Sequence, residues 1–535
     1  MTSTADNLQV ATRLDADVLV IGGGPAGTWA AITAAAQGAK VILADKGFCG
    51  TSGATAPSGT GVWYVPPDPG LRAKAMNSRW DMGGRLADPV WMRRVLDQTY
   101  SNVNLLSEWG HPFPQAADGT QIRTSLDGPD YMRLMRKRVK AAGVRILDHS
   151  PVLELLRDGS GAVAGAVGLR RQRGDLWQVQ AGAVVIATGG CAFLSKALGC
   201  NVLTGDGYLM AAELGAELSG MEFSSAYAMA MEHGSVTKTR FYDWAEFTYA
   251  DGSPIPGAAS KGGRTAIART LSAGKGVFAR LNADAETQIA MRHAQPNFFV
   301  PLDRSGINPF TDRFPVTLRL EATVRGTGGL RLLDESCATS VPGLYAAGDA
   351  ATRELICGAF TGGGSHNAAW AMSSGAWAGS GAAQFARGQR GRAAQLYRAG
   401  GVGIREGKGA RIDAAGLTHA VREIVLPYEN TYQRHGARLE ASLSTLDGLW
   451  ASARSADEAS RDEALRTREG LAMLATARWM YRSALARTES RGMHKREDFP
   501  QADEAQRHHI ISGGLDEVWT TPAPVAGPAL EVLAA

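Results

Sequence analysis

Runs of apolar residues separated by short polar or glycine-rich stretches predict an α/β fold for the first part of the chain. Residues 17–21 (Asp-Val-Leu-Val-Ile) are typical of a buried strand, and residues 25–37 have the apolar spacing of a helix. Gly38 is placed to end that helix, and residues 40–44 form a second apolar strand. The order strand, helix, strand predicts a βαβ unit.

Two later apolar runs end in the same way as the first. Residues 183–187 (Ala-Val-Val-Ile-Ala) lead into Thr-Gly-Gly, and residues 343–347 (Gly-Leu-Tyr-Ala-Ala) lead into Gly-Asp. In an open α/β sheet, ligands bind at the carboxyl ends of the strands. The three strands are therefore expected to converge on one ligand site.

The middle and the end of the chain follow other patterns. Residues 225–341 are rich in aromatic residues, arginine and proline and lack the βαβ alternation, which indicates an inserted domain. Three prolines in residues 520–535 predict an extended tail. From residue 394 the pattern is helical and charged, with one apolar helix face formed by Leu439, Leu443, Leu446 and Leu449.

The turn between the first strand and the first helix has the spacing of a dinucleotide cradle. Gly22, Gly24 and Gly27 lack a Cβ atom, so the chain can reverse and its amides can approach a pyrophosphate at the positive end of a helix. Asp45 follows the second strand, where a carboxylate can accept hydrogen bonds from ribose hydroxyls. Because strand, glycines, helix, strand and acid occur in this order, we prefer a dinucleotide site to a glycine-rich turn without a ligand.

Composition and charge narrow the classes of partner. The chain has 535 residues and a net charge of +4, from 56 basic and 52 acidic residues, which gives no argument for binding nucleic acid or an anionic membrane. Its five cysteines include no pair at the spacing of a zinc or iron–sulfur site, so we expect no metal in this chain. Residues 1–14 are polar, and no run of 18 apolar residues follows. These features predict a cytoplasmic protein without a transmembrane segment.

Four segments together resemble one protein family. Besides the glycine turn they are Thr204–Leu218 with Met221–Phe223, Pro342–Asp349, and Ala484–Pro500. With these segments the chain resembles the fumarate reductase/succinate dehydrogenase flavoprotein family, which includes L-aspartate oxidase and the adenylylsulfate reductase α subunit. The resemblance implies FAD as cofactor, a capping domain that closes over the flavin, and hydride transfer between a substrate and flavin N5.

The resemblance also implies the domain order. We expect an α/β fold with a Rossmann-like FAD-binding domain, an inserted α+β capping domain and a C-terminal helical domain. The FAD-binding domain would comprise residues 14–224 and 342–393, the capping domain 225–341, the helical domain 394–519 and the extended tail 520–535.

The family pattern, matched residue by residue, assigns the FAD-binding positions. The ADP half would lie on the glycine turn, with Asp45 on the adenosine ribose, and the Ser/Gly-rich run after it would line the pyrophosphate and the flavin. A helix that begins at Ser365 would direct its N-terminus at the flavin and stabilise negative charge on reduced flavin. The predicted cofactor-binding residues are Gly22, Gly24, Pro25, Ala26, Gly27, Asp45, Lys46, Thr51, Ser52, Gly53, Gly59, Gly61, Ala187, Thr188, Gly189, Asp206, Gly348, Asp349, Ser365 and Asn367.

Departures from the family pattern concern the flavin linkage and the substrate. Members that bind flavin covalently carry a histidine in the early Ser/Gly run, where this chain has Ser52-Gly-Ala-Thr, so we expect non-covalent FAD. Members that use dicarboxylates carry an arginine near the position of Phe360 and a histidine near that of Arg325. Simple succinate or fumarate chemistry is therefore not expected.

Three residues are candidates for the chemistry. Arg269, with Arg264 as second choice, is the nearest match to the proton-transferring arginine of fumarate-reducing members, although a salt bridge or an anion contact explains it equally well. Arg325 is placed to hold an anionic substrate group, or else lies on the surface. His366 starts a helix beside the predicted flavin, where it suits acid/base work or only a helix-start hydrogen bond. The charged run Arg487–Asp498 is expected to form ion pairs that dock the helical domain onto the FAD-binding domain or a partner subunit.

The leading interpretation is an FAD-dependent oxidoreductase, a dehydrogenase, reductase or oxidase, that exchanges a hydride with a small organic substrate across a C–C or C–N bond. No second nucleotide-binding βαβ unit follows the first, so the other substrate of the flavin is expected to be dioxygen, a quinone or an electron-transfer protein. One alternative is an adenylylsulfate-reductase-like subunit that relays electrons with an iron–sulfur partner, because the Phe360-Thr361 run resembles that branch. Another is a binding protein whose FAD is structural.

Overall fold

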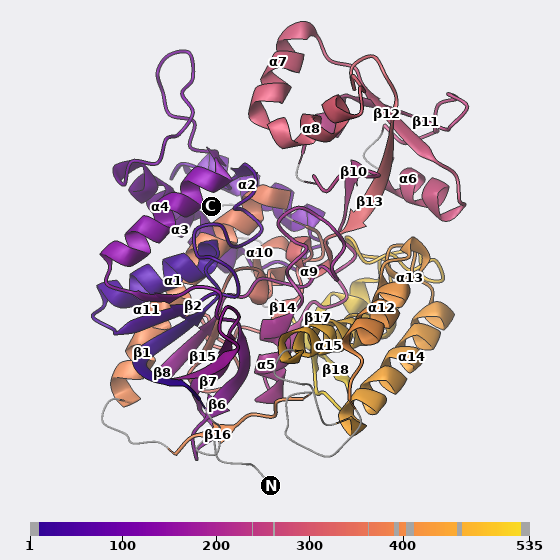
Figure 1. Ribbon diagram of the computed structural model, residues 1–535. Helices are drawn as coiled ribbons and strands as arrows, with labels where there is room; N and C mark the ends of the chain where they lie inside the picture. The colour runs from indigo at the N-terminus through magenta and orange to yellow at the C-terminus, as the bar shows by residue number, and fades with distance from the viewer. Residues whose placement is uncertain are drawn as a thin grey trace.

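Three parts make up the molecule in Figure 1: a layered α/β part in indigo and violet, a smaller sheet with helices at the top of the view, and a group of orange helices at the right. The structure is a computed structural model. It describes residues 10–237, 239–259, 263–361, 363–389, 395–402, 411–456 and 463–525.

The eight-stranded main sheet is parallel at its centre and antiparallel toward one side. Its order is β16-β6-β7-β8-β1-β2-β5, and β15 also pairs with β8. In β1, Val18 is opposite Val41 of β2 and Ala183 of β8, and its side chain is fully buried, as expected at the centre of a parallel sheet. The strands are β1 (Thr12–Ile21), β2 (Val41–Ala44), β5 (Arg145–Leu147), β6 (Val152–Arg157), β7 (Val163–Arg170), β8 (Asp175–Ile186), β15 (Leu344–Ala346) and β16 (Tyr397–Arg398).

Helices cover one side of this sheet, where α1 and α11 lie next to each other (Figure 1). Three of the other helices begin at an aspartate that accepts a hydrogen bond from an amide of the first turn, which satisfies part of the helix end. The helices of this part are α1 (Pro25–Ala36), α2 (Pro69–Met82), α3 (Pro89–Glu108), α4 (Gly128–Ala141), α5 (Asp206–Glu213), α10 (Glu354–Cys357) and α11 (Gly363–Gln389), and a short ribbon joins β3 (Thr60–Gly61) to β4 (Ser125–Leu126).

The inserted segment folds into an antiparallel sheet with the order β10-β13-β12-β11. The chain enters this part after β9 (Leu218–Ser219) and leaves it through α9 (Ala322–Arg325) into β14 (Gly329–Leu330). Phe298, Phe299 and Phe314 are buried in its core. Its elements are β10 (Tyr227–Met231), β11 (Ala245–Thr248), α6 (Gly263–Ser272), β12 (Val277–Leu281), α7 (Ala285–Ala294), α8 (Pro296–Arg304) and β13 (Phe314–Leu320).

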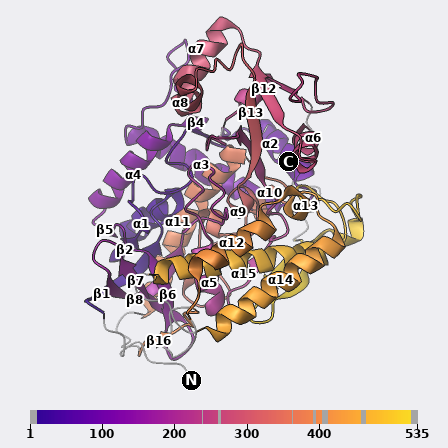
Figure 2. The ribbon, with the colours of Figure 1, turned by 45° about the vertical axis from the view of Figure 1, so that its right-hand side comes forward.

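The C-terminal part is mainly helical, and its long helices lie side by side in Figure 2. The long helices are α12 (Ala414–Val425), α14 (Gly436–Ser455) and α15 (Ala464–Ala486), and the four-residue helix α13 (Tyr428–Thr431) lies between α12 and α14 in the chain. Two strands follow that the sequence pattern did not reveal, β17 (His508–Gly513) and β18 (Trp519–Pro524). They complete a four-stranded sheet, β14-β9-β17-β18, in which β17 is hydrogen-bonded to β9, the strand that precedes the inserted part.

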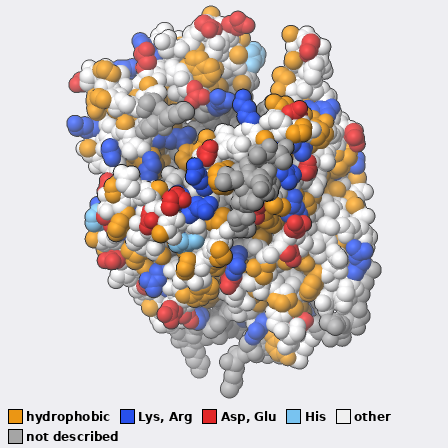
Figure 3. Space-filling view, turned by 180° about the vertical axis from the view of Figure 1, so that it is seen from behind, with side chains coloured by type: hydrophobic (Ala, Val, Ile, Leu, Met, Phe, Trp, Pro, Cys, Tyr) orange, Lys and Arg blue, Asp and Glu red, His pale blue; other side chains and the backbone are white. Residues whose placement is uncertain are grey.

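The predicted extended tail is partly paired in the structure. Residues 520–524 of the predicted tail are extended but paired with β17, whereas residues 526–535 lie outside the described residues. Among the helices of the described ranges, none combines the length and the apolar character needed to span a bilayer. In the view from behind, basic and acidic side chains are interspersed, in keeping with the small net charge (Figure 3).

Candidate functional site

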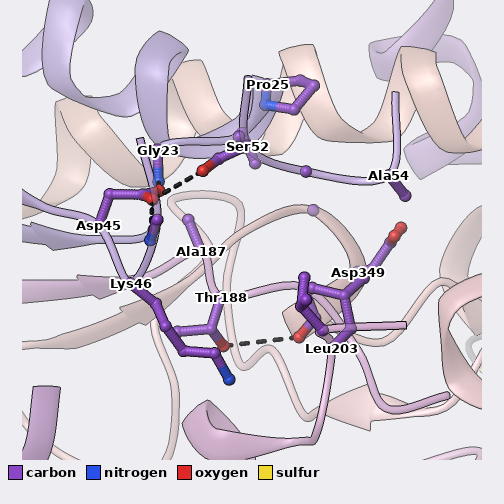
Figure 4. A pocket seen from close by; sticks show the side chains of 18 of the residues that line it. Gly23, Pro25, Asp45, Lys46, Ser52, Ala54, Ala187, Thr188, Leu203 and Asp349 are labelled. Carbon is purple, nitrogen blue, oxygen red and sulfur yellow. Dashed lines mark hydrogen bonds between the residues drawn. The ribbon is translucent and has the colours of Figure 1, made fainter. Parts of the chain in front are cut away.

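A cavity of about 380 Å³ lies at the carboxyl ends of β1, β2, β8 and β15. Asp45 and Lys46 stand at one end of the view in Figure 4, and Ala54, Leu203 and Asp349 stand at the other. The first turns of α1 and α11 both contribute to its wall. Sixteen of the twenty predicted cofactor residues line it: Gly22, Gly24, Pro25, Ala26, Asp45, Lys46, Thr51, Ser52, Gly53, Ala187, Thr188, Gly189, Asp206, Gly348, Asp349 and Asn367.

The glycine turn between β1 and α1 leaves no room for side chains. A Cβ atom on Gly22, whose φ is +109°, would lie 2.2 Å from the carbonyl oxygen of Ala187, and one on Gly27 would lie 1.8 Å from that of Gly22. Gly24 precedes α1 and offers no side-chain cap, so the first amides of the helix are left for a ligand. A pyrophosphate fits this arrangement because it brings negative charge and acceptor oxygens to a helix N-terminus.

Asp45 is held by donors from the protein itself. It is only 3% exposed, and its carboxylate accepts hydrogen bonds from the amides of Gly23 and Gly47 and from the Ser52 hydroxyl, the last at 2.7 Å (Figure 4). An ionised carboxylate has about four acceptor sites, so one remains for a ribose hydroxyl. Asp45 therefore ties the glycine turn to the Ser/Gly-rich loop, a role that the sequence did not predict.

Lys46 connects the cavity to the C-terminal helices. Its Nζ lies 2.8 Å from Asp206 of α5 and 2.6 Å from Glu469 of α15. Burial disfavours the charged amine, but the two carboxylates outweigh it and raise the pKa of Lys46 above its ordinary value. Lys46 therefore stays protonated and can face a phosphate oxygen while its own charge is balanced.

The far end of the cavity is built where the chain returns from the inserted sheet. Val324 and Arg325 line it together with Asn367, whose side-chain amide donates to the Val324 carbonyl at 3.1 Å. The Arg325 side chain is 19% exposed, and its Nε lies 3.4 Å from a carboxylate oxygen of buried Glu321. At this end of the cavity the Arg325 guanidinium is therefore held in one orientation, and the N-terminus of α11 also contributes to the wall.

Arg353 holds the two walls of that end together. Its fully buried guanidinium pairs with Asp349 and donates to the carbonyls of Thr323 and Val324, both at 3.0 Å. Asp349 follows β15 and Val324 lies in α9, and both line the cavity, so Arg353 fixes the separation of these two segments. The sequence signal for this role is an arginine four positions after the predicted ligand Asp349.

Four predicted cofactor residues do not line the cavity: Gly27, Gly59, Gly61 and Ser365. Gly27 lies against the carbonyl of Gly22, where it permits close packing of helix on strand. Gly61 and Ser365 face each other, because a Cβ atom on Gly61 would lie 3.5 Å from that of Ser365. They pack β3 against α11 instead of facing the cavity.

Of the three predicted catalytic residues, only Arg325 lines the cavity. Arg269 is exposed on α6, because the apolar face of that helix, with Ile267 and Ala268, turns inward. The ring of His366 packs against Trp63, with centroids 4.4 Å apart, and its Nδ1 lies 3.2 Å from the Ser365 hydroxyl. The structure thus leaves Arg269 and His366 outside the cavity wall.

Several residues of the wall were missed by the sequence reasoning. They include Phe48, Val152, Arg171 and Leu203. Phe48 follows Asp45 by three positions and could have been noticed, whereas Val152 and Arg171 reach the cavity only because β6 and β7 join the same sheet. No histidine is among the described residues that line the cavity.

A cavity whose wall contains a glycine cradle and the N-termini of two helices, α1 and α11, is typical of a dinucleotide-binding protein. Residues 17–229 match the family model described as FAD binding domain, and residues 429–519 match the one described as fumarate reductase flavoprotein C-term. Through these two segments the chain is similar to the fumarate reductase/succinate dehydrogenase flavoprotein family. It is an FAD-dependent oxidoreductase.

Relatives and solved structures agree with this assignment. The chain is 27% identical to an L-aspartate oxidase of Streptomyces coelicolor over 99% of its own length and 98% of that protein. It is 28% identical to a urocanate reductase of Eggerthella lenta over 40% of either chain. E. coli quinol fumarate reductase superposes with a TM-score of 0.80 at 21% identity, covering 97% of this chain and 98% of the other. Adenylylsulfate reductase of Archaeoglobus fulgidus gives 0.77 at 19% identity, covering 98% of both chains, and both structures support the fold alone.

Proposed function

We propose that the protein oxidises or reduces a C–N or C–C bond of a small anionic substrate, with a carboxylate-bearing amine as the first choice. The observation that carries this proposal is Arg325, the guanidinium in the cavity wall on the side of the inserted sheet. Full-length similarity to an L-aspartate oxidase supports an amine as substrate. Bound FAD would supply a two-electron centre that accepts or donates a hydride.

The residues of this chain would bind and orient the substrate. Arg325 can bind a carboxylate through two parallel hydrogen bonds, and Glu321 limits the rotation of its side chain. Val324 contributes an apolar surface next to it and helps to exclude water. The N-terminus of α11 would stabilise negative charge that develops at this end.

Phe360 does not contradict an anionic substrate. Its side chain packs with Leu86, Phe223, Ala359 and Met493 and does not line the cavity. The absence of an arginine at that position removes one of the two charge contacts of the dicarboxylate-using members. A substrate with one carboxylate bound by Arg325 is therefore favoured over succinate or fumarate.

Anaerobic bleaching of the bound flavin tests the proposal. Amino acids, including L-aspartate, and dicarboxylates are added in turn to the purified protein, and the loss of oxidised flavin absorbance is followed. Replacing Arg325 with Met should raise the half-saturating concentration of the active substrate about 10- to 100-fold, because a hydrogen bond to a charged group is lost. R325K should recover part of this loss, since it keeps the charge.

The exposed Arg269 supplies the matched control, and R269M should behave as the wild type. The proposal fails if no anionic substrate bleaches the flavin, or if R325M and wild type saturate at the same concentration. Reduction only in the presence of an iron–sulfur protein would instead favour the electron-relay alternative.

A further inference from the structure

The end of the cavity beyond Asp45 carries an aromatic ring that no motif predicted. Phe48 is 40% exposed and lines the cavity together with Pro151, Val152 and Arg171. The pyrophosphate is expected at the start of α1, and the ribose at the end of β2. The adenine ring of FAD then comes next in this direction, where these residues lie.

An ion pair holds the Phe48 ring in place. The guanidinium carbon of Arg136 lies 3.9 Å from the centre of the ring. Both oxygens of Asp148 bind this guanidinium, at 3.0 and 2.8 Å, and the Cys49 carbonyl accepts a third hydrogen bond from it at 2.6 Å. Asp148 also accepts from the Cys49 amide at 2.9 Å, so the loop, the ion pair and the ring form one rigid unit.

We propose that Phe48 is the residue on which the adenine of FAD stacks, and that Arg136 and Asp148 are positioning residues that hold the ring. An aromatic side chain is a favourable surface for any flat base, and stacking of one base contributes about 1–3 kcal/mol by alanine substitution. The guanidinium of Arg136 covers the ring on one side and fixes its orientation, which lowers the entropy lost when adenine binds.

Titration with cofactor fragments separates stacking from a general effect on folding. The full-length protein is freed of FAD, and the affinities for ADP, FAD and FMN are measured by calorimetry. F48A should lower the affinities for ADP and FAD by a similar factor, roughly 5- to 100-fold. The affinity for FMN should not change, because FMN has no adenine. F48W should bind ADP as well as the wild type does.

The chain offers a matched control on its surface. Phe499 is 42% exposed, and the guanidinium of Arg496, held by both oxygens of Asp498, lies 5.1 Å from the centre of its ring. It does not line the cavity. F499A should therefore bind ADP, FAD and FMN with wild-type affinity.

A double-mutant cycle tests the positioning role of Arg136. R136M should weaken ADP binding in the wild-type background and cause no further loss in the F48A background, since Arg136 acts through the ring. Additive losses would remove the positioning role. The proposal as a whole is overturned if the affinity of F48A for ADP is within twofold of the wild-type affinity. It is also overturned if F48A lowers the affinity for FMN as much as the affinity for FAD. Because these measurements involve no turnover, their result is independent of the substrate proposed for Arg325.

Discussion

At the scale of single residues, backbone geometry decides which positions can build the cradle. Gly22 and Gly38 both have a positive φ, +109° and +80°, which residues other than glycine rarely adopt. Their surroundings differ, because a Cβ atom on Gly22 would meet the Ala187 carbonyl at 2.2 Å, whereas one on Gly38 would meet nothing within 4 Å. A side chain at Gly38 would therefore cost only the strain of the left-handed backbone, whereas a side chain at Gly22 would add a steric clash.

Replacing each glycine with alanine should expose this difference. G38A should lower the free energy of unfolding by about 1–2 kcal/mol, the cost of the left-handed conformation alone. G22A adds a clash with the backbone of β8 and should lose both stability and FAD content, because the amides of the turn must move. Thermal unfolding and the ratio of flavin to protein check this. Equal effects of the two variants would show that the turn is not tightly packed.

At the scale of elements, the connection after α15 is a network of buried charges. Arg487 pairs with Glu222 at 2.8 Å and with Glu489 at 2.9 Å, and all three side chains are fully buried. Arg491 donates to the Gly84 carbonyl at 2.7 Å. The predicted ion-pair network of this run is confirmed, and within the described chain it joins the helical part to the part that precedes the inserted sheet.

The same connection should make the C-terminal part sensitive to acid. Hydrogen bonds from Arg496 hold the pKa of Asp498 below its ordinary value. The ordinary pKa of an Asp side chain in an unfolded chain is about 3.9. Just below that pH, Asp498 therefore stays ionised in the folded protein, whereas the same group in the unfolded chain binds a proton. The pair stabilises the fold above about pH 4, and its contribution is lost as the pH falls below that value.

Replacing Asp498 with Asn tests this dependence. Between about pH 6 and pH 3 the melting temperature of the wild type should fall more steeply than that of D498N, because the variant has no carboxylate to protonate. D15N, which removes an exposed partner of Lys40, is the control and should keep the slope of the wild type. Parallel curves for D498N and wild type would contradict the prediction.

At the scale of the whole molecule, the cavity lies where all three parts meet. The glycine turn and α11 belong to the layered part, Arg325 follows the inserted sheet, and Glu469 of α15 reaches Lys46 from the helical part. A ligand in this cavity is expected to stabilise all three parts of the fold. At a concentration 100 times its dissociation constant it should raise the free energy of unfolding by about 2.7 kcal/mol.

Removal of FAD should therefore lower the melting temperature of the full chain and reduce the protection of α15 amides in hydrogen exchange. Acid precipitation should leave the flavin in the supernatant, because no histidine is among the described residues that line the cavity. A yellow pellet would disprove the non-covalent linkage. Unchanged exchange in α15 would show that Lys46 does not couple the cofactor to the helical part.

Local pattern sufficed for the βαβ unit, because a strand, a glycine turn and a helix are specified by neighbouring residues. It also placed Gly22, Gly24 and Asp45 at the cavity, and the longer family segments identified FAD. It failed for β17, which pairs with β9 some 290 positions away in the chain, and for β18, which pairs with β17 at the edge of the same sheet.

The sequence by itself determined the cradle, because its residues are close together in the chain, and it identified the cofactor through the longer family segments. The tertiary structure alone decided which of the remaining candidate side chains reach the cavity. Arg325 and Phe48 reach the cavity, whereas Arg269 turns outward and His366 packs on Trp63. The physical reason is that the direction of a side chain depends on how its helix or loop is rotated against distant elements, and the spacing of residues in the chain does not contain that rotation.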